Sequence, residues 1–130
     1  AIGALDLTHE EPYPVGVARS IRMQGRPSDA EIAVAVIDSH HDRGLGTILL
    51  AAGAHAAAAR GVTAFVASVL RDNRAMLDLF AELDAEHHAG EAGVVELRIP
   101  IHAEASHYPD TPTGASFKRV YALIDRLDTP

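Results

Sequence analysis

Residues 40–50, HHDRGLGTILL, stand where a run of apolar residues ends and an alanine-rich stretch begins. The preceding stretch EIAVAVID, residues 31–38, carries apolar residues on both faces, which is the pattern of a strand covered above and below. The stretch from Ile48 to Arg60 has almost no β-branched residues and is followed by Gly61, as expected for a helix that ends at a glycine. Residues 40–50 therefore join a central strand to a helix through a glycine-containing loop.

A loop of this kind can bind phosphate. Gly44 and Gly46 let backbone N–H groups approach a ligand closely at the positive end of a helix. Arg43 can add a full charge and Thr47 a hydroxyl donor. A tight turn without a ligand is the alternative reading of two glycines. The P-loop pattern G-x-x-x-x-G-K-[ST] is absent, and Leu49 stands where a dinucleotide fingerprint has its third glycine, so ATP and NAD are poor candidates.

The sequence on either side of this loop predicts a mixed sheet. Residues 2–7 and 15–23 read as an antiparallel hairpin, and residues 25–29, GRPSD, read as a break in the chain. Residues 62–70 are again apolar on both faces. Residues 31–70 therefore form a strand, helix, strand unit with two parallel strands and a right-handed crossover.

Two further helices and a last strand follow. Asp72 or Asn73 can cap a helix whose apolar residues recur at helical spacing, namely Met76, Leu79, Phe80 and Leu83. Residues 92–101 close the sheet. The segment 113–130 is expected to be an amphipathic helix that extends a single domain of residues 1–130, with Phe117, Val120, Tyr121, Ile124 and Leu127 on one face.

Composition limits the partners. The chain has 11 Lys and Arg against 18 Asp and Glu, a net charge of -7, which argues against a nucleic-acid partner. The absence of cysteine excludes disulfides, thiolate metal sites and cysteine nucleophiles, and it favours a cytoplasmic protein. No apolar stretch is suited to cross a bilayer, so no membrane contact is expected. The chain opens at Ala1 in a strand-like stretch, which suggests that an upstream segment has been removed or was not included.

Two motifs together carry a resemblance to a known family. The segments RGLGTILL, residues 43–50, and NRAMLDLF, residues 73–80, in this order and at this separation resemble the GNAT family of acetyl-CoA-dependent N-acetyltransferases. The resemblance covers roughly residues 2–101 and is closest to bacterial protein lysine acetyltransferases, including actinobacterial ones that modify acyl-CoA synthetases. It implies an α/β fold whose mixed, mostly antiparallel sheet has a central parallel strand-helix-strand unit and flanking helices.

The resemblance also implies a coenzyme site and no metal. In this family the loop N–H groups hold the pyrophosphate of coenzyme A, and the preceding strand pairs with the pantetheine arm. The residues at the matching positions are Val36, Ile37, His41, Arg43, Gly44, Leu45, Gly46, Thr47 and Asn73. Acetyl-CoA is therefore the expected cosubstrate.

Several positions depart from the family pattern. His41 occupies the first position of the pyrophosphate motif, and Asp42 places a negative charge where a glycine is common, which predicts weaker coenzyme binding. Phe80 stands where many members carry a tyrosine acid. Residues 83–85 replace the usual Leu-Gly-Phe, which predicts displaced final strands. The usual N-terminal strand and helices have no counterpart, so another segment, a fused domain, the C-terminal helix or a second copy is expected to cover that side.

Glu31 is the candidate catalytic residue. Acyl transfer needs an uncharged amine, whereas a lysine ammonium has a pKa of about 10.4, so a proton acceptor is useful. Related protein acetyltransferases, including histone-modifying ones, carry a functional glutamate at a similar point, and the alternative reading is a solvated carboxylate at a strand end. The expected activity is direct transfer of acetyl to a primary amine, with a protein lysine as acceptor. The alternative function is a non-catalytic acyl-CoA-binding or regulatory module.

The remaining titratable residues receive no role. The pairs His40, His41 and His87, His88 are read as solvated loop histidines, because adjacent side chains diverge too far to chelate one metal easily. Arg71 and Arg74 flank the second motif. Their presence would be explained by an exposed helix start or by a contact to the adenosine 3′-phosphate.

Overall fold

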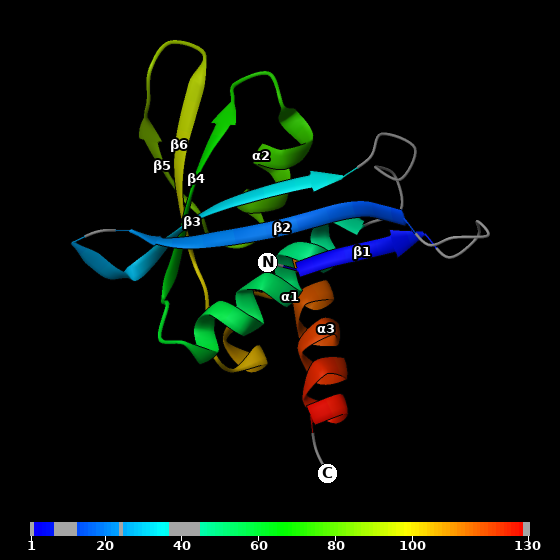
Figure 1. Ribbon diagram of the computed structural model, residues 1–130. Coiled ribbons are helices and arrows are strands. Elements are labelled where there is room, and N and C mark those ends of the chain that lie inside the picture. The colour runs from blue at the N-terminus through cyan, green and yellow to red at the C-terminus, as the bar shows by residue number, and fades with distance from the viewer. Residues whose placement is uncertain (1, 7–12, 24, 37–44, 129–130) are drawn as a thin grey trace.

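The computed structural model describes residues 2–6, 13–23, 25–36 and 45–128. The described strands form one sheet in the order β1 (Ile2–Asp6), β2 (Tyr13–Met23), β3 (Arg26–Val36), β4 (Ala64–Leu70), β6 (Val94–Pro100) and β5 (Glu86–Ala89) (Figure 1). The helices are α1 (Leu45–Ala59), α2 (Arg74–Ala81), α3 (Pro112–Asp128) and the short 3-10 helix η2 (Ala105–His107). Only β3 and β4 pair in parallel among the described strands, and α1 connects them. The predicted α/β fold with a central parallel unit is confirmed.

The N-terminal strands form the predicted hairpin, but the predicted break after it is absent from the described residues. β1 pairs antiparallel with β2, and β2 pairs antiparallel with β3. The segment 25–29 is wrong as a break, because β3 already begins at Arg26 after a turn in which Gly25 has a φ of 77°. The register of β2 with β3 is irregular beside Met23, and a proline such as Pro27 is tolerated where a strand is irregular.

The far edge of the sheet also differs from expectation. The strand predicted at residues 92–101 is β6, but it lies between β4 and β5 instead of closing the sheet. The edge strand is β5, which contains His87 and His88. These two histidines are therefore strand residues, and the prediction of a loop is wrong, although both are exposed. A four-residue polar strand is too short to show an alternation of apolar and polar residues, so its formation depends on pairing with β6.

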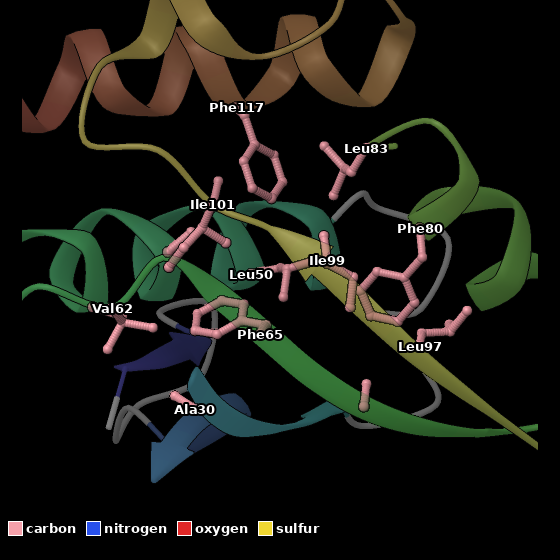
Figure 2. Packing of buried hydrophobic residues seen from close by; sticks show 14 of the residues in the cluster. Ala30, Leu50, Val62, Phe65, Phe80, Leu83, Leu97, Ile99, Ile101 and Phe117 are labelled. Atoms are coloured by element: carbon pink, nitrogen blue, oxygen red, sulfur yellow. The ribbon is translucent and has the colours of Figure 1, made fainter. Parts of the chain in front are cut away.

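The hydrophobic core fills one face of the sheet. Phe65, Ala67 and Val69 of β4 are buried with residues of all three α-helices, whereas Ser68 and Leu70, on the opposite face, are exposed. Both faces of β4 are apolar in sequence, but the described residues cover only the helical face. Figure 2 shows Phe80, Leu83 and Phe117 converging from the helical side on Phe65 and Ile99 of the sheet. Burying each large side chain stabilises the fold by about 1.5–3 kcal/mol.

Helix α3 packs across α1 and ends beyond the core. Phe117 and Tyr121 are fully buried, as predicted, but Leu127 is 75% exposed, so the predicted apolar stripe fails at its C-terminal end. Figure 1 shows why, because the last turns of α3 project away from the sheet. The helix start is fixed by Thr113, whose backbone N–H and hydroxyl both donate to Glu82 after α2, at 2.9 and 2.8 Å.

A close backbone approach also fixes the start of α3. A Cβ added at Gly114 would overlap the carbonyl oxygen of Pro109, so a side chain there would push α3 away from the preceding turn. The helix found at Pro112–Asp128 is thus held at a defined position on α1.

Two buried tyrosines link α3 to the chain after β6. The hydroxyls of Tyr108 and Tyr121 are 2.7 Å apart, and the Tyr121 hydroxyl donates to the carbonyl of His102 at 2.7 Å. Tyr108 also accepts the backbone N–H of His102 at 3.0 Å. Burial raises the pKa of both phenols above the ordinary value. For Tyr121 the hydrogen bond to Tyr108 raises the pKa further.

These shifts predict an alkaline loss of stability. The unfolded chain has tyrosine pKa values of about 10, so a higher pKa in the fold means that unfolded chains release the proton first. The stabilisation is complete below pH 10 and declines as the pH rises above it, by up to about 1.4 kcal/mol per pH unit for each phenol. We expect the free energy of unfolding, measured in urea, to fall less between pH 8 and pH 11 in Tyr121→Phe than in the parent. Equal differences in the two proteins would contradict this assignment.

Candidate active site

The central parallel strands separate at the middle of the sheet. Their register pairs Asp29 with Ala64, Ala30 with Phe65 and Glu31 with Val66. Both strands continue beyond these pairs, β3 to Val36 and β4 to Leu70, but they are not paired with each other there. Every second residue of a strand points its backbone N–H and C=O to the same edge, so this stretch of β3 offers backbone groups that an extended amide-bearing ligand can pair with.

A cavity lies at this opening. Its volume is about 320 Å³, and it lies between the two strands and α2. The lining residues are Ile32, Ala67, Ser68, Val69, Leu70, Asn73, Met76 and Phe80. Most of these side chains are apolar, with one hydroxyl and one amide among them, which suits a narrow ligand that carries a few hydrogen-bonding groups. β3 and β4 form its walls because their pairing ends at Glu31 and Val66.

Helix α1 follows β3 in the chain. Leu45, Gly46 and Thr47 are its first three residues, and their N–H groups belong to the turn that lacks partners within the helix. A Cβ added at Gly46 would meet no atom of the described residues within 4 Å. Of the residues predicted for the coenzyme, Val36 ends β3, whereas Ile37, His41, Arg43 and Gly44 lie outside the described residues.

Asn73 directly precedes α2 and lines the cavity. As predicted, it caps the helix, because its side-chain oxygen accepts the backbone N–H of Met76 at 3.3 Å. This bond fixes the carboxamide at the rim of the cavity, and the side-chain nitrogen can still act as a donor. One residue can therefore serve as both a helix cap and a ligand contact.

The cavity contains no phenol among the residues that line it. Phe80 is 3% exposed and its ring is part of the core. Tyr108 and Tyr121 are buried beside α3 and do not line the cavity. The described tyrosine side chains therefore give no acid for a departing thiolate at this site.

Glu31 lies on the face of the sheet opposite the helices. Its side chain is exposed, and it stands at the last paired position before β3 and β4 separate. Directly paired residues share a face of the sheet, so a row of side chains runs across β2, β3, β4, β6 and β5 through Ile21, Glu31, Val66, Arg98 and Glu86. The Glu31 carboxylate is therefore reached from the face that the described helices leave exposed.

A second carboxylate on this face was missed by reasoning from sequence. The hydroxyl of Ser68 lies 2.8 and 2.9 Å from the two carboxylate oxygens of Glu96, which it meets across the β4 and β6 pair. Ser68 lines the cavity, so Glu96 is held close to its rim. No local motif signals this contact, because it depends on the register of two strands that are distant in sequence.

Other charged groups of the described residues give no candidate metal site. Within residues 2–6, 13–23, 25–36 and 45–128, no cluster of three or more His, Asp and Glu side chains could hold a metal ion. Arg71 and Arg74 are both exposed at the start of α2. A membrane-spanning helix is also absent from the described residues, since none of their helices is long and apolar enough.

Comparison with known proteins identifies relatives of this arrangement. The model of the acetyltransferase (GNAT) family matches residues 5–85, which is more than half of the chain. The GNAT domain of S. lividans PAT is similar, with 29% identity over 68% of this chain and 55% of that chain and a TM-score of 0.61. A mutant of the cAMP-binding acyltransferase from Mycobacterium smegmatis has 26% identity over 87% of this chain and 34% of that chain, with a TM-score of 0.61.

A third structure shares the fold. It is a putative acetyltransferase from Salmonella typhimurium, solved with its cofactor acetyl-CoA, which has 22% identity over 75% of this chain and 63% of that chain and a TM-score of 0.56. The chain thus spans 55% of the S. lividans domain and 34% of the M. smegmatis protein.

Proposed function

The chain belongs to the acetyltransferase (GNAT) family, and we propose that it binds acetyl-CoA and transfers the acetyl group directly to a primary amine, a lysine of a protein. The observation that carries this proposal is the opening between β3 and β4, where a cavity of about 320 Å³ adjoins the first turn of α2. The resemblance to the family implies that β3 pairs with the pantetheine arm, which would then lie in this opening. The S. typhimurium structure with this fold has acetyl-CoA as its cofactor.

The coenzyme would follow the path from α1 to α2. Its pyrophosphate would lie against the backbone of Gly44, Leu45 and Gly46, because the N–H groups at the start of α1 favour an anion. Thr47 would add a hydroxyl, and His41 and Arg43 would add donors from the preceding loop. The pantetheine amides would pair with β3 up to Val36 and Ile37 and with the side chain of Asn73, and the thioester would reach the cavity.

The acceptor amine would approach from the opposite face, where Glu31 lies. The amine nitrogen would attack the thioester carbonyl, the new C–N bond would form, and the C–S bond would break to release the thiolate of coenzyme A. Glu31 would take the proton from the amine, directly or through a water molecule, and that proton or another from water would pass to the thiolate. Phe80 cannot act as the acid. No covalent intermediate with the protein is needed.

One observation favours the alternative of a binding module without catalysis. The acid position is filled by Phe80, whose ring is 3% exposed and packed in the core, so the residue described there cannot donate a proton. Binding of acetyl-CoA does not separate the two functions, because both require it. Turnover separates them, because a binding module would leave the bound coenzyme intact.

The proposal is tested by measuring binding and turnover in one preparation. We expect calorimetry to show saturable binding of acetyl-CoA and no comparable binding of ATP. With a pool of lysine-containing peptides, we expect release of free thiol and a mass increase of one acetyl group per modified lysine. Binding without thiol release from any peptide would support the module, and absence of acetyl-CoA binding would contradict both functions.

A further inference from the structure

Ser68 lies on the rim of the cavity at the strand opening. β3 and β4 stop pairing after Glu31 and Val66, and Ser68 is two residues further along β4, a distance of about 7 Å. Residues two apart on a strand share a face, so Ser68 lies on the same face of the sheet as Val66 and its partner Glu31. Among the described residues that line this cavity, Ser68 carries the only hydroxyl, and its side chain is exposed. The hydroxyl can therefore be reached from the face without helices.

Glu96 fixes the direction in which the Ser68 hydroxyl donates. The Oγ atom of Ser68 lies 2.8 Å from Oε1 and 2.9 Å from Oε2 of Glu96. A hydroxyl has one proton and two lone pairs, whereas an ionised carboxylate can only accept a hydrogen bond. Ser68 therefore donates its single proton to Glu96. Toward the cavity the Ser68 oxygen can accept a hydrogen bond, but it has no proton left to donate.

The position of Glu96 is defined by its neighbours. Its side chain is half-buried, and the residue pairs with Ser68 on β4 and with His88 on β5. Gly90 leaves room for it, because a Cβ added there would lie 3.1 Å from Cγ and 3.4 Å from Oε1 of Glu96. Within the described part of the chain, Glu96 forms no ion pair. The carboxylate is thus held beside Ser68 and keeps its negative charge.

An oxygen that only accepts, with a carboxylate behind it, suits a primary amine. An alkylammonium has three N–H donors and no lone pair, and its positive charge is attracted to Glu96. After it loses a proton, the neutral amine can donate one N–H to Ser68 and keep its lone pair free for attack on a carbonyl carbon. An amide N–H of the pantetheine arm is the other donor that could bind here, and it would change coenzyme affinity instead.

We propose that Ser68 accepts a hydrogen bond from the substrate amine at the rim of the cavity, and that Glu96 is a positioning residue that acts through Ser68. The inference rests on the proposed function, in which this amine attacks a thioester in the cavity. Glu31 and Ser68 are one strand spacing and two residues apart, so their Cα atoms are separated by about 8 Å. One amine between them can contact both side chains, with Ser68 holding it and Glu31 taking its proton.

The test separates binding of the substrate amine from binding of the coenzyme. With the most active lysine peptide of the pool and saturating acetyl-CoA, we expect Ser68→Ala to raise the peptide KM about 10- to 100-fold, the usual range for a hydrogen bond to a charged group. The kcat should stay nearly unchanged, because the contact is also made in the ground state. Glu96→Gln should raise the peptide KM by no more than Ser68→Ala does. The dissociation constant of acetyl-CoA, measured by calorimetry, should not change in either variant.

Matched variants exclude a merely structural effect. Ser68→Thr keeps the hydroxyl and Ser68→Val removes it at the same size, and both new residues favour strands, so only Ser68→Val should raise the peptide KM. Glu86→Gln removes the same charge as Glu96→Gln, from an exposed residue on the same face, and should keep the parent KM. Because Glu96 acts through Ser68, the double variant Ser68→Ala, Glu96→Gln should have the KM of Ser68→Ala alone.

Other results would overturn the inference in distinguishable ways. A parent peptide KM in both Ser68→Ala and Glu96→Gln would remove both residues from the amine site. Weaker binding of acetyl-CoA with an unchanged peptide KM would place Ser68 against the pantetheine arm. Multiplied losses in the double variant would show that Glu96 does not act through Ser68. If the parent itself binds no acetyl-CoA, or binds it without releasing thiol, the proposed function fails, and this result is seen before any variant is made.

Discussion

Replacing Glu31 with glutamine is expected to lower turnover about 10²- to 10⁴-fold, the usual effect of removing a general base. Glutamine keeps the shape of the side chain and loses its basicity. Binding of acetyl-CoA should be almost unchanged, because Glu31 lies on the face opposite the helices and does not line the coenzyme cavity. Thiol release and calorimetry measure the two quantities on the same preparation.

The pH dependence separates proton transfer from positioning. A lysine with a pKa of about 10.4 is almost entirely protonated at pH 7, so the base matters most there. The loss in Glu31→Gln should therefore shrink as the pH approaches the pKa of the acceptor, where free amine is already abundant. A uniform loss at every pH would instead indicate that Glu31 positions the acceptor.

A matched control lies on the same row of the sheet. Glu86 is exposed on the same face, three strands away from Glu31, and three spacings of about 4.8 Å separate them by roughly 14 Å. Glu86→Gln makes the same change of charge and should retain the parent turnover. If Glu31→Gln also turned over at the parent rate, Glu31 would have no part in the mechanism, and proximity of the bound substrates would have to explain the rate.

The strand-helix-strand unit could be predicted because its signals are local. Apolar runs mark β3 and β4, and the alanine-rich stretch between them contains few residues that disfavour a helix. The break assigned to residues 25–29 is wrong for an equally local reason. Glycine and proline usually interrupt strands, but here the irregular register with β2 accommodates them inside one continuous hairpin.

The edge strand β5 and the faces of β4 could not be predicted in this way. Residues 86–89 are polar and short, and they form a strand because β6 pairs with them. Leu70 belongs to a stretch that is apolar on both faces, yet it is 62% exposed, because the core occupies only the helical face of the described sheet. Both features depend on partners that are distant in the chain, which periodicity does not report.

The candidate site also contains residues that local motifs could indicate and contacts that depend on distant parts of the chain. Gly46 and Asn73 could be singled out from motifs, since a loop before a helix and a helix cap are fixed by neighbouring residues. The Ser68 and Glu96 contact requires the register of β4 with β6. The site outside the motifs is therefore a product of tertiary packing.

Replacing Gly46 with valine is expected to abolish acetyl-CoA binding while leaving the protein folded. A Cβ at this position meets no atom of the described chain within 4 Å, and Gly46 is the second residue of α1, so the described part of the fold leaves room for a side chain there. The proposed pyrophosphate, however, would lie against this backbone, and the branched side chain of valine would occupy its place. The effect on binding is therefore steric and does not depend on a loss of stability.

Gly46→Ala tests this separation of fold from function. Without coenzyme, alanine in place of glycine in a helix should raise the free energy of unfolding by about 0.5–1 kcal/mol, because the unfolded chain has less conformational freedom to lose. With acetyl-CoA at 100 times its dissociation constant, the parent should gain about 2.7 kcal/mol from binding, whereas both Gly46 variants should gain much less. The measurement is thermal unfolding with and without acetyl-CoA.

Ala59→Val controls for valine in a helix, because Ala59 is the exposed last residue of α1, at the end opposite Gly46. This variant should show the full stabilisation by acetyl-CoA. If Gly46→Val were also stabilised like the parent, the pyrophosphate would not lie at the start of α1, and the family assignment of the glycine loop would not apply to this chain. If Gly46→Val were unfolded without coenzyme, the open space at this position would be filled by residues outside the described chain, and Gly46→Ala would then decide where the pyrophosphate lies.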